Sequence, residues 1–505
     1  MAGYPPGMAR RVAVLVVAAA LLFPAAASAR DDTIKSFDGT KIALSFFPAP
    51  GLKQGQRAPT VMIGPGWSQS RSAANDSGLA AFGYAGPKVF LDAGYNVLTW
   101  DPRGFGESGG TVQADSPQYE GRDVRHLITY VARQPEARLD SRRDPRLGME
   151  GASYGGGIQL VTAGSDRRID AIIPVIAWHS LVTSLAKDGS PKAGWGSILY
   201  ALGEEGSHHR LNPHISDALR QGLATGRIPP NDIEWFRSRG PGDRLVRRIH
   251  APALLIQGTA DTLFTLQEAI WNFRILRHHQ VPAHMIWFCG GHGTCLTNPG
   301  DPSVLHEAML DWFAKYLRRK PVRTGPRFEW VDQDGAWRTA PDWPIPHPQS
   351  LNAMGAGNLP LTAGAASGDP IAATPSADAF NLAIPAPKRR QRYAVGVPRL
   401  KLRYSGTAAP EEDTFVYAQI VDLTRGVVMG PVVRPIPVRL DGKRHRITRK
   451  LEPVAWTVKP GDRYELQLAP STQVYGPQRS SGIVRFSRVN VSVPLLARDA
   501  RVRPG

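Results

Sequence analysis

Residues 146–164 read RLGMEGASYGGGIQLVTAG, and this stretch decides the fold class. Its apolar start is typical of a short buried strand and its end of a helix, with glycines between them. Within the turn, Gly151, Ser153 and Gly155 form the pattern G-x-S-x-G. Small residues on both sides of a serine allow the chain to turn sharply and to expose the hydroxyl at the tip. We therefore predict that Ser153 is a nucleophile rather than one residue of a glycine-rich turn.

Strand and helix patterns alternate on both sides of this turn, from residue 31 to about residue 320. Apolar runs bounded by turn residues predict buried strands at residues 60–64, 95–101, 146–151, 169–177, 251–258 and 283–289. Residues 116–134 and 301–320 repeat apolar residues at the spacing of a helix. Alternation of this kind is typical of a parallel sheet covered by helices, so the first two-thirds of the chain are predicted to form an α/β domain.

A serine nucleophile needs a base, and the base needs an acid that orients it. In domains of this type the acid and the histidine follow the serine along the chain. Asp261 comes directly after the last but one predicted strand, and His292 directly after the last. Asp301 competes for the role of the acid, but it fits better as the cap of the final helix. The sequence therefore predicts a triad of Ser153, Asp261 and His292.

Two backbone N–H groups are expected to stabilise the oxyanion that forms during attack. Tyr154, which follows the nucleophile, supplies the first. The second is expected in GPGWSQS, after the first predicted strand, where Trp67 is favoured over Ser68. A further motif, DPRGFGESGG, begins at Asp101, and we interpret Asp101 and Arg103 as residues that brace the neighbouring loops.

The only two cysteines of the chain flank the predicted base in CGGHGTC, residues 289–295. A structural zinc site commonly uses four ligands from paired motifs, and the sequence offers no second cysteine pair. Two cysteines in an oxidising compartment favour a disulfide. We therefore predict a bond between Cys289 and Cys295 that restricts the loop of His292, and we expect no metal and no other cofactor.

Residues 178–248 interrupt the α/β pattern with helical stretches and polar loops, and we interpret them as a lid over the site. Trp195, Tyr200 and Trp235 fit equally well as the lining of a substrate pocket or as the small core of the lid. His179 follows a strand and is a further candidate for the pocket.

The first residues have the layout of a secretory signal peptide: Arg10 and Arg11, an apolar run, and an A-x-A cleavage site that ends at Ala29. Residues 1–29 are therefore expected to be removed, and the protein to be secreted or held in the cell envelope. The formal net charge is +18, with basic clusters at LRRKPVR, KRRQR and KRHRITRK. No recognisable nucleic-acid-binding module accompanies them. We expect no nucleic-acid partner and at most a weak attraction to anionic cell-surface polymers.

After Pro321 the pattern changes to short strands with alternating apolar residues, typical of a β-sandwich or jelly roll. Residues 327–344 contain two strand-like runs joined by a D-G turn. Residues 351–387 are rich in Ala, Gly, Pro and Ser and are interpreted as a long loop. We therefore expect a catalytic domain at residues 30–320 and a sandwich domain at residues 321–505 that walls its cleft.

Four motifs in this order, GASYGG, QGTADTLF, GGHG and WRTAPDWP, resemble those of the X-Pro dipeptidyl-peptidase (S15) and cocaine-esterase-like family. The resemblance covers nearly all of the chain after residue 29. It implies an α/β-hydrolase domain with a helical lid, a C-terminal jelly roll, and a serine hydrolase that uses Ser153, Asp261 and His292. Cocaine-esterase-like members take an oxyanion donor from a tyrosine hydroxyl on the early loop. Here GPGWSQS contains no tyrosine, so the backbone of Trp67 is expected to serve instead.

The leading hypothesis is an exported serine hydrolase that cleaves carboxylic esters or amides of small substrates. An aminopeptidase that releases X-Pro dipeptides needs an anion to hold the free amine of its substrate, and Glu204 and Glu205 of the lid are the candidates. An acyltransferase forms the same acyl-enzyme but excludes water. The fourth hypothesis is a non-catalytic surface-binding protein, and the complete set of triad residues argues against it.

Overall fold

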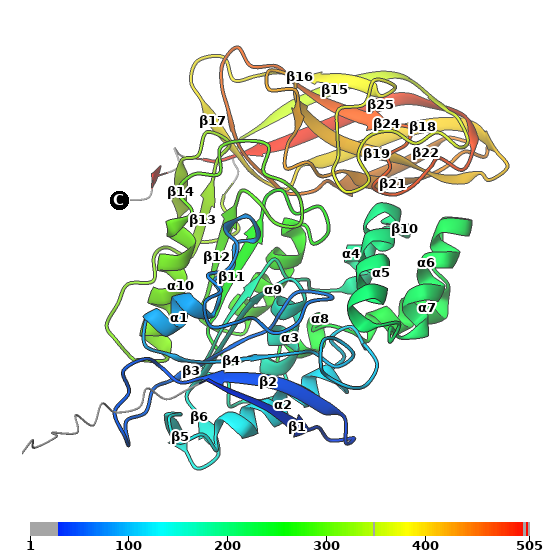
Figure 1. Ribbon diagram of the computed structural model, residues 1–505. Coiled ribbons are helices and arrows are strands. Elements are labelled where there is room, and N and C mark those ends of the chain that lie inside the picture. The colour runs from blue at the N-terminus through cyan, green and yellow to red at the C-terminus, as the bar shows by residue number, and fades with distance from the viewer. Residues whose placement is uncertain (1–28, 347–348, 498–500, 503–505) are drawn as a thin grey trace, which may run out of the picture.

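The computed structural model describes residues 29–346, 349–497 and 501–502. It contains a large sheet with helices on both faces, a group of helices beside that sheet, and a β-rich part above it (Figure 1). Nearly all of the predicted signal peptide, residues 1–28, lies outside the described residues. Within the described ranges, no helix is both long enough and apolar enough to cross a membrane.

The large sheet has eleven strands in the order β1-β2-β4-β3-β7-β8-β11-β12-β13-β14-β26. Its strands from β4 to β13 pair in parallel, whereas the strands at both edges pair antiparallel. Their bounds are β1 (Arg30–Lys35), β2 (Lys41–Phe47), β3 (Thr60–Ile63), β4 (Asn96–Trp100), β7 (Leu147–Ala152), β8 (Ala171–Val175), β11 (Ala253–Gly258), β12 (Ala283–Phe288), β13 (Phe328–Val331), β14 (Trp337–Ala340) and β26 (Arg501–Val502).

The central strands are buried because helices cover both faces of the sheet. One face packs against the apolar residues of α2 (Glu120–Val131), α3 (Tyr154–Ala163), α8 (Gly242–Val246) and α9 (Leu266–His278). The other face packs against α1 (Pro87–Asp92) and α10 (Ser303–Tyr316). Three short elements lie outside these layers: η1 (Ala80–Phe82), β5 (Leu139–Ser141) and β6 (Asp144–Pro145). In such a sheet the loops at the carboxyl ends of the strands carry the functional residues.

Helices occupy most of the segment interpreted as a lid. It contains α4 (Leu181–Leu185), β9 (Ala186–Lys187), β10 (Ser190–Pro191), α5 (Ala193–Ser207), α6 (Pro213–Thr225) and α7 (Pro230–Arg237). In Figure 1 these helices stand beside the large sheet and below the β-rich part. Their apolar side chains share one cluster with Tyr154 and Phe264, so the helices are packed onto the loops of the sheet.

The β-rich part consists of two larger antiparallel sheets and one two-stranded sheet around a shared apolar core. The first has the order β15-β25-β18-β22; the second has the order β16-β24-β19-β20, with β21 also paired to β19; β17 pairs only with β23. The bounds are β15 (Gln349–Leu361), β16 (Phe380–Ile384), β17 (Arg392–Gly396), β18 (Arg399–Ala409), β19 (Asp413–Asp422), β20 (Val427–Val428), β21 (Arg434–Arg439), β22 (His445–Lys450), β23 (Val454–Val458), β24 (Tyr464–Ala469) and β25 (Ser481–Leu495). The predicted fold class, an α/β domain with a helical lid followed by a β-sandwich, is confirmed.

The prediction of a long loop at residues 351–387 was wrong. β15 pairs with β25 from Gln349 to Leu361, and β16 follows within the same stretch. The glycines that suggested a loop are required by close packing in the sandwich. A Cβ at Gly355 would lie 2.8 Å from Leu382, and one at Gly357 would lie 2.5 Å from Phe380. Composition alone does not distinguish a loop from a strand that needs small residues for this reason.

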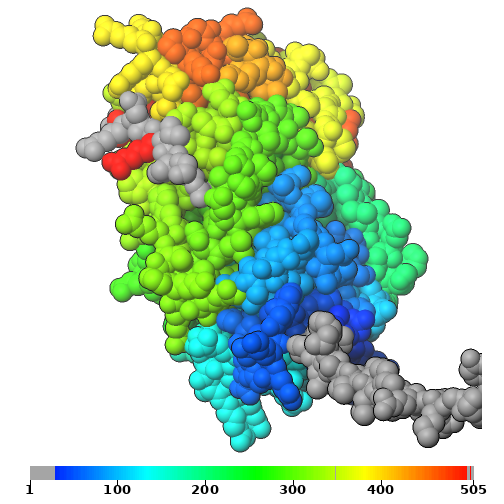
Figure 2. Space-filling view, turned by 60° about the vertical axis from the view of Figure 1, so that its left-hand side comes forward, coloured from blue at the N-terminus to red at the C-terminus, as the bar shows by residue number. Residues whose placement is uncertain are grey.

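The boundary expected after residue 320 also differs from the structure. The hairpin of β13 and β14 continues the large sheet, because β13 pairs in parallel with β12. The ring of Phe328 packs between Trp287 and Trp330, at centroid distances of 4.7 and 5.2 Å. Tyr393 and Leu496 of the sandwich part share the apolar cluster of the sheet, so the two parts form one packed body. Figure 2 shows the yellow and orange sandwich seated directly on the green segments of the sheet part.

Candidate active site

Ser153 lies at the tip of the turn between β7 and α3. Its φ of 56° and ψ of −114° are strained for a residue with a side chain, as in a nucleophile elbow. The loop after β3 crosses this turn closely. A Cβ at Gly155 would collide with the carbonyl oxygen of Gly64, and one at Gly151, where φ is 144°, would lie 2.6 Å from the same oxygen. Both glycines of the motif are therefore needed for the turn that presents Ser153.

His292 bridges Ser153 and Asp261. Its Nε2 lies 2.8 Å from Oγ of Ser153, and its Nδ1 lies 2.8 Å from Oδ2 of Asp261. With a proton on Nδ1, the ring donates a hydrogen bond to Asp261 and accepts one from the serine hydroxyl. The structure thus brings together the three residues predicted as a triad. They come from the loops after β7, β11 and β12, which end at the same edge of the sheet.

Asp261 is fully buried and is held by the backbone that follows it. Its Oδ1 accepts N–H hydrogen bonds from Leu263 at 3.1 Å and from Phe264 at 2.7 Å. Both bonds leave Oδ2 directed at His292. The rival acid, Asp301, instead accepts the N–H of Ser303 at the start of α10, where a cap was expected. His179 bonds to neither Ser153 nor Asp261: its ring nitrogens bond to Asn272 and Asp243, and it is not among the residues that line the pocket beside Ser153.

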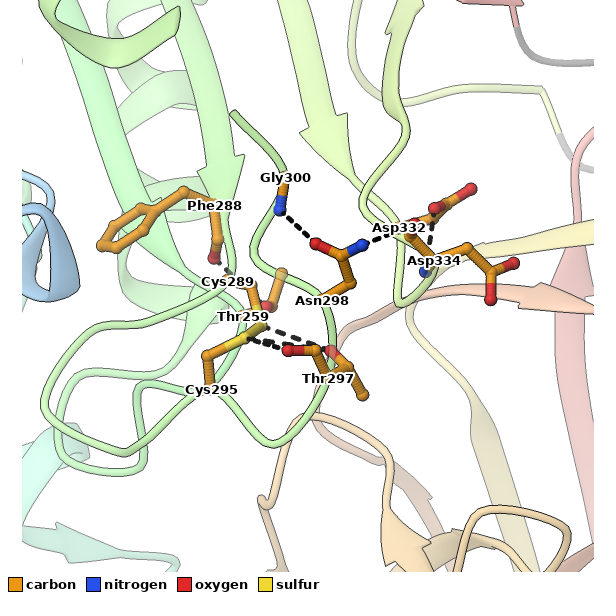
Figure 3. The surroundings of a disulfide bond; sticks show 9 residues. All are labelled: Thr259, Phe288, Cys289, Cys295, Thr297, Asn298, Gly300, Asp332 and Asp334. Atoms are coloured by element: carbon orange, nitrogen blue, oxygen red, sulfur yellow. Dashed lines mark hydrogen bonds between the residues drawn. A yellow bond between two sulfur atoms is a disulfide. The ribbon is translucent and has the colours of Figure 1, made fainter. Parts of the chain in front are cut away.

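A disulfide joins Cys289 and Cys295 across the loop that carries His292, with their Cα atoms 5.3 Å apart, so the predicted bond is confirmed. Figure 3 shows Thr297 beside both sulfur atoms, and Asn298 between Gly300 and Asp334 of the next hairpin. The loops after β11 and β12 are joined as well, because Thr259 donates its N–H to Phe288 O at 2.7 Å.

Among the described residues, no group of His, Cys, Asp and Glu side chains could hold a metal ion.

Replacing both cysteines by serine is expected to reduce kcat/KM about tenfold, because a histidine displaced by about 1 Å reacts up to a hundred times more slowly. The loop is short, so the bond is expected to stabilise the fold by only about 2 kcal/mol. Ester hydrolysis and thermal unfolding of the double variant measure the two effects, and Thr297→Val, which keeps the bond, is the matched control. An unchanged rate in the double variant would show that the bond has no part in positioning His292.

Trp67 and Tyr154, whose backbone N–H groups are the expected oxyanion donors, line the same pocket as Ser153. The N–H of Tyr154 belongs to the first turn of α3, where backbone N–H groups have no partner within the helix. The loop of Trp67 passes over the elbow, and the indole packs on Tyr154 at a centroid distance of 5.3 Å. Trp67 also donates its Nε1–H to Leu199 O of the lid at 2.8 Å. Its side chain thus ties the early loop to α5, and the role of its backbone N–H stays a prediction.

A largely apolar pocket opens beside Ser153. The lid contributes most of its walls, among them Leu199, Tyr200, Ile215, Leu219 and Phe236. Of the aromatic residues considered for the pocket, Tyr200 lines it, while Trp235 packs on His214 within the lid. Trp195 packs edge-on against the ring of His292 and donates its Nε1–H to Thr262. None of the described residues around the pocket is an aspartate or a glutamate.

Of the described residues that line this pocket, Lys192 is the only one with a charged side chain. Its Nζ donates to the carbonyl oxygens of Thr262 and Leu263, both at 2.7 Å, next to the acid of the triad. Burial lowers the pKa of Lys192 to about 7, so near neutral pH the amine is partly uncharged. Sequence reasoning missed this residue, because a single lysine between Pro191 and Ala193 carries no recognisable pattern.

Two buried carboxyl groups lie behind Tyr154. The tyrosine hydroxyl lies 3.4 Å from Glu120 and accepts the N–H of Asp115 at 3.1 Å. Burial raises the pKa of Glu120 to about 7 and raises that of Asp115 well above its ordinary value. These contacts fix the side chain of Tyr154, the residue whose backbone N–H is predicted to stabilise the oxyanion. No sequence signal identified them, because Glu120 resembles an ordinary acidic residue in the first turn of a helix.

The family model of X-Pro dipeptidyl-peptidase (S15 family) matches residues 38–294. A CocE/NonD family hydrolase from Staphylococcus aureus has a similar solved structure, with a TM-score of 0.65, 15% identity and coverage of 92% of this chain and 93% of that one. An aminopeptidase from a marine sediment archaeon, Thaumarchaeota archaeon, has a TM-score of 0.66, 14% identity and coverage of 93% and 96%. An uncharacterized 31.7 kDa protein of Escherichia coli is 30% identical over 120 residues, which are 23% of this chain and 40% of the relative. The chain thus matches less than half the length of this curated relative.

The fold and the matched family define the class of this protein as a serine hydrolase of esterase or peptidase type. The solved structures, at 14–15% identity, show the fold, whereas the family model covers about half of the chain. Within its class, the chain belongs to the X-Pro dipeptidyl-peptidase (S15) family.

Proposed function

We propose that the protein hydrolyses carboxylic esters with an uncharged, apolar acyl group through an acyl-enzyme on Ser153. The observation that carries this proposal is the 2.8 Å hydrogen bond between His292 Nε2 and Ser153 Oγ. A base and a nucleophile at this distance are already placed for proton transfer.

In the proposed reaction, His292 takes the hydroxyl proton while Oγ of Ser153 attacks the carbonyl carbon. Asp261 stabilises the imidazolium, and the N–H groups of Tyr154 and Trp67 stabilise the oxyanion. His292 then gives its proton to the departing alcohol. A water molecule, activated by the same ring, releases the acid and regenerates Ser153.

The pocket supports an uncharged acyl group. Apart from Lys192 and the hydroxyl of Tyr200, its lid-side walls are apolar, among them Leu199, Ile215, Leu219 and Phe236, and such walls favour the burial of apolar groups. The cationic amine of an X-Pro peptide or an α-amino ester would need an anion, and the cost of burying an unpaired charge is high. Glu204 bonds to His209, and neither Glu204 nor Glu205 is among the residues that line the pocket.

Export is part of the same proposal. Its support is the arrangement of Arg10, Arg11, the apolar run and the A-x-A site, together with the Cys289–Cys295 disulfide. Disulfides persist in oxidising compartments and are rare in the cytosol. Mass spectrometry of the protein recovered from outside the cytoplasm, with a first residue at position 30, would test this part.

The substrate class is tested by comparing p-nitrophenyl butyrate with the p-nitrophenyl ester of 2-aminobutyrate, which differs only by the amine. We expect kcat/KM to be at least about tenfold higher for the butyrate, because the pocket leaves an ammonium group unpaired. Leu219→Glu, which places a carboxylate in the pocket wall, is expected to narrow this ratio. A preference of the unmodified enzyme for the amino ester or for Ala-Pro-p-nitroanilide would contradict the proposed substrate class.

A further inference from the structure

Two of the basic clusters in the sequence, KRRQR and KRHRITRK, lie in or next to one sheet of the sandwich. This sheet, β15-β25-β18-β22, lies in the β-rich part at the top of Figure 1. Three of its strands contribute eight lysines and arginines: Arg399, Lys401 and Arg403 from β18, Arg446, Arg449 and Lys450 from β22, and Arg485 and Arg488 from β25. None of its four strands, all of them described, contains an aspartate or a glutamate.

Seven of these side chains lie on the outer face of the sheet. Arg399, Lys401 and Arg403 alternate with buried Leu400 and Leu402, so they point away from the sandwich core. Lys450 pairs with Arg399, and both Arg446 and Arg488 pair with Arg403. Arg485 pairs with Ser405 and is exposed like the others. We call this set the basic sheet face: Arg399, Lys401, Arg403, Arg446, Lys450, Arg485 and Arg488.

This arrangement opposes the stability of the sheet. Like charges on directly paired residues are destabilising, and the register places Arg399 opposite Lys450 and Arg403 opposite Arg446 and Arg488. No described acidic residue forms an ion pair with any member of the basic sheet face. Three arginines elsewhere in the sandwich do form ion pairs with acidic residues: Arg425, Arg434 and Arg439. A face that keeps repelling charges unpaired is suited to an anionic partner.

A groove continues the basic sheet face toward the hydrolase part. It shares Arg399, Lys450 and Ser492 with the sheet. α9 adds Trp271 and Arg274, and no described residue that lines the groove is acidic. Gln349, also in its wall, accepts a hydrogen bond from Arg392 of the cluster KRRQR. The groove and the face therefore form one continuous basic surface.

We propose that this surface binds an acidic polysaccharide whose sugar rings carry carboxylates. The arginine guanidinium group matches the planar carboxylate through two parallel hydrogen bonds. Asn352, Asn490 and Ser492 supply hydrogen-bonding groups for hydroxyls between the cations, and the indole of Trp271 offers a flat surface for a sugar ring. A bilayer is a poorer partner, because binding to it requires exposed apolar side chains. Among the described residues of these four strands, Met354 is the only large apolar side chain that is exposed. A groove accommodates an extended polymer chain better than the flat surface of a membrane.

The binding of polygalacturonate, measured by calorimetry at low and high salt, tests the proposal. Arg399→Glu/Arg403→Glu/Lys450→Glu is expected to weaken binding by at least about 100-fold, at about a factor of five for each of the three cations removed. The matched control is Arg133→Glu/Arg138→Glu/Arg142→Glu, which makes the same change of net charge on exposed residues at the far end of the molecule. It is expected to change binding by no more than about twofold, because screening confines these interactions to about 10 Å.

Lys401→Gln/Arg488→Gln provides a second test, since it removes two charges without adding repulsion, and it is expected to weaken binding about 25-fold. Turnover of p-nitrophenyl butyrate reports whether each variant is folded. Equal weakening by the triple variant and its control would overturn the proposal, because the attraction would then depend on net charge alone. Tighter binding to phosphatidylglycerol vesicles or to single-stranded DNA than to polygalacturonate would also overturn it.

Discussion

Replacing Ser153 by alanine is expected to reduce kcat for p-nitrophenyl butyrate by about a million-fold. The hydroxyl oxygen is the attacking atom in the proposed reaction, and an alanine leaves no nucleophile within reach of His292. The fold is expected to persist, because the smaller side chain fits the elbow and the backbone N–H of Ser153 still bonds to Val175. Circular dichroism and thermal unfolding check this point.

The matched control for that variant is Ser68→Ala. Ser68 is also a serine with positive φ, and it lies on the neighbouring loop after β3, but its hydroxyl has no part in the proposed reaction. Its rate is expected to stay within about twofold of the unmodified enzyme, as for most substitutions away from the chemistry. Wild-type turnover in Ser153→Ala would show that another residue is the nucleophile.

Replacing Asp261 by asparagine is expected to reduce kcat by about 10⁴-fold. The amide keeps the size of the carboxylate, but it removes the charge that stabilises the imidazolium. The amide also does not hold the proton of His292 on Nδ1. When that proton moves to Nε2, this nitrogen can no longer accept the proton of the Ser153 hydroxyl. Steady-state kinetics across pH 6–9 measure the loss.

Asp301→Asn is the control for the acid, because Asp301 was the rival in the sequence and lies at the start of α10. It is expected to leave kcat unchanged and to change the stability of that helix little, because an asparagine oxygen accepts the N–H of Ser303 about as well as a carboxylate oxygen does. A larger loss of rate in Asp301→Asn than in Asp261→Asn would reverse the assignment of the acid.

The candidate site was largely predictable because each residue belongs to a short pattern on one strand and its loop. The glycines around Ser153 mark a sharp turn, Asp261 and His292 each follow an apolar run, and the cysteines around His292 are close in sequence. Such patterns need no knowledge of which strands are neighbours. The parallel sheet then brings their ends together.

The features that were missed depend on contacts between distant segments. β15 resembles a loop in composition, and only its pairing with β25 makes it a strand. The β13–β14 hairpin joins the large sheet through the packing of Phe328 on Trp287, which local sequence does not show. The basic sheet face likewise required the register of β18 against β22 and β25. The carboxyls of Asp115 and Glu120 became notable only once their burial was known.

The central claim, that Ser153 is the nucleophile activated by His292, is tested most directly by covalent labelling. The purified protein is treated with a fluorophosphonate, digested, and mapped by tandem mass spectrometry, with Asp261→Asn treated in parallel. We expect one adduct, on the Ser153 hydroxyl, forming much more slowly in Asp261→Asn because His292 is no longer held as a base. An adduct on a different residue, or active enzyme that hydrolyses esters after full exposure without any adduct on Ser153, would contradict the account.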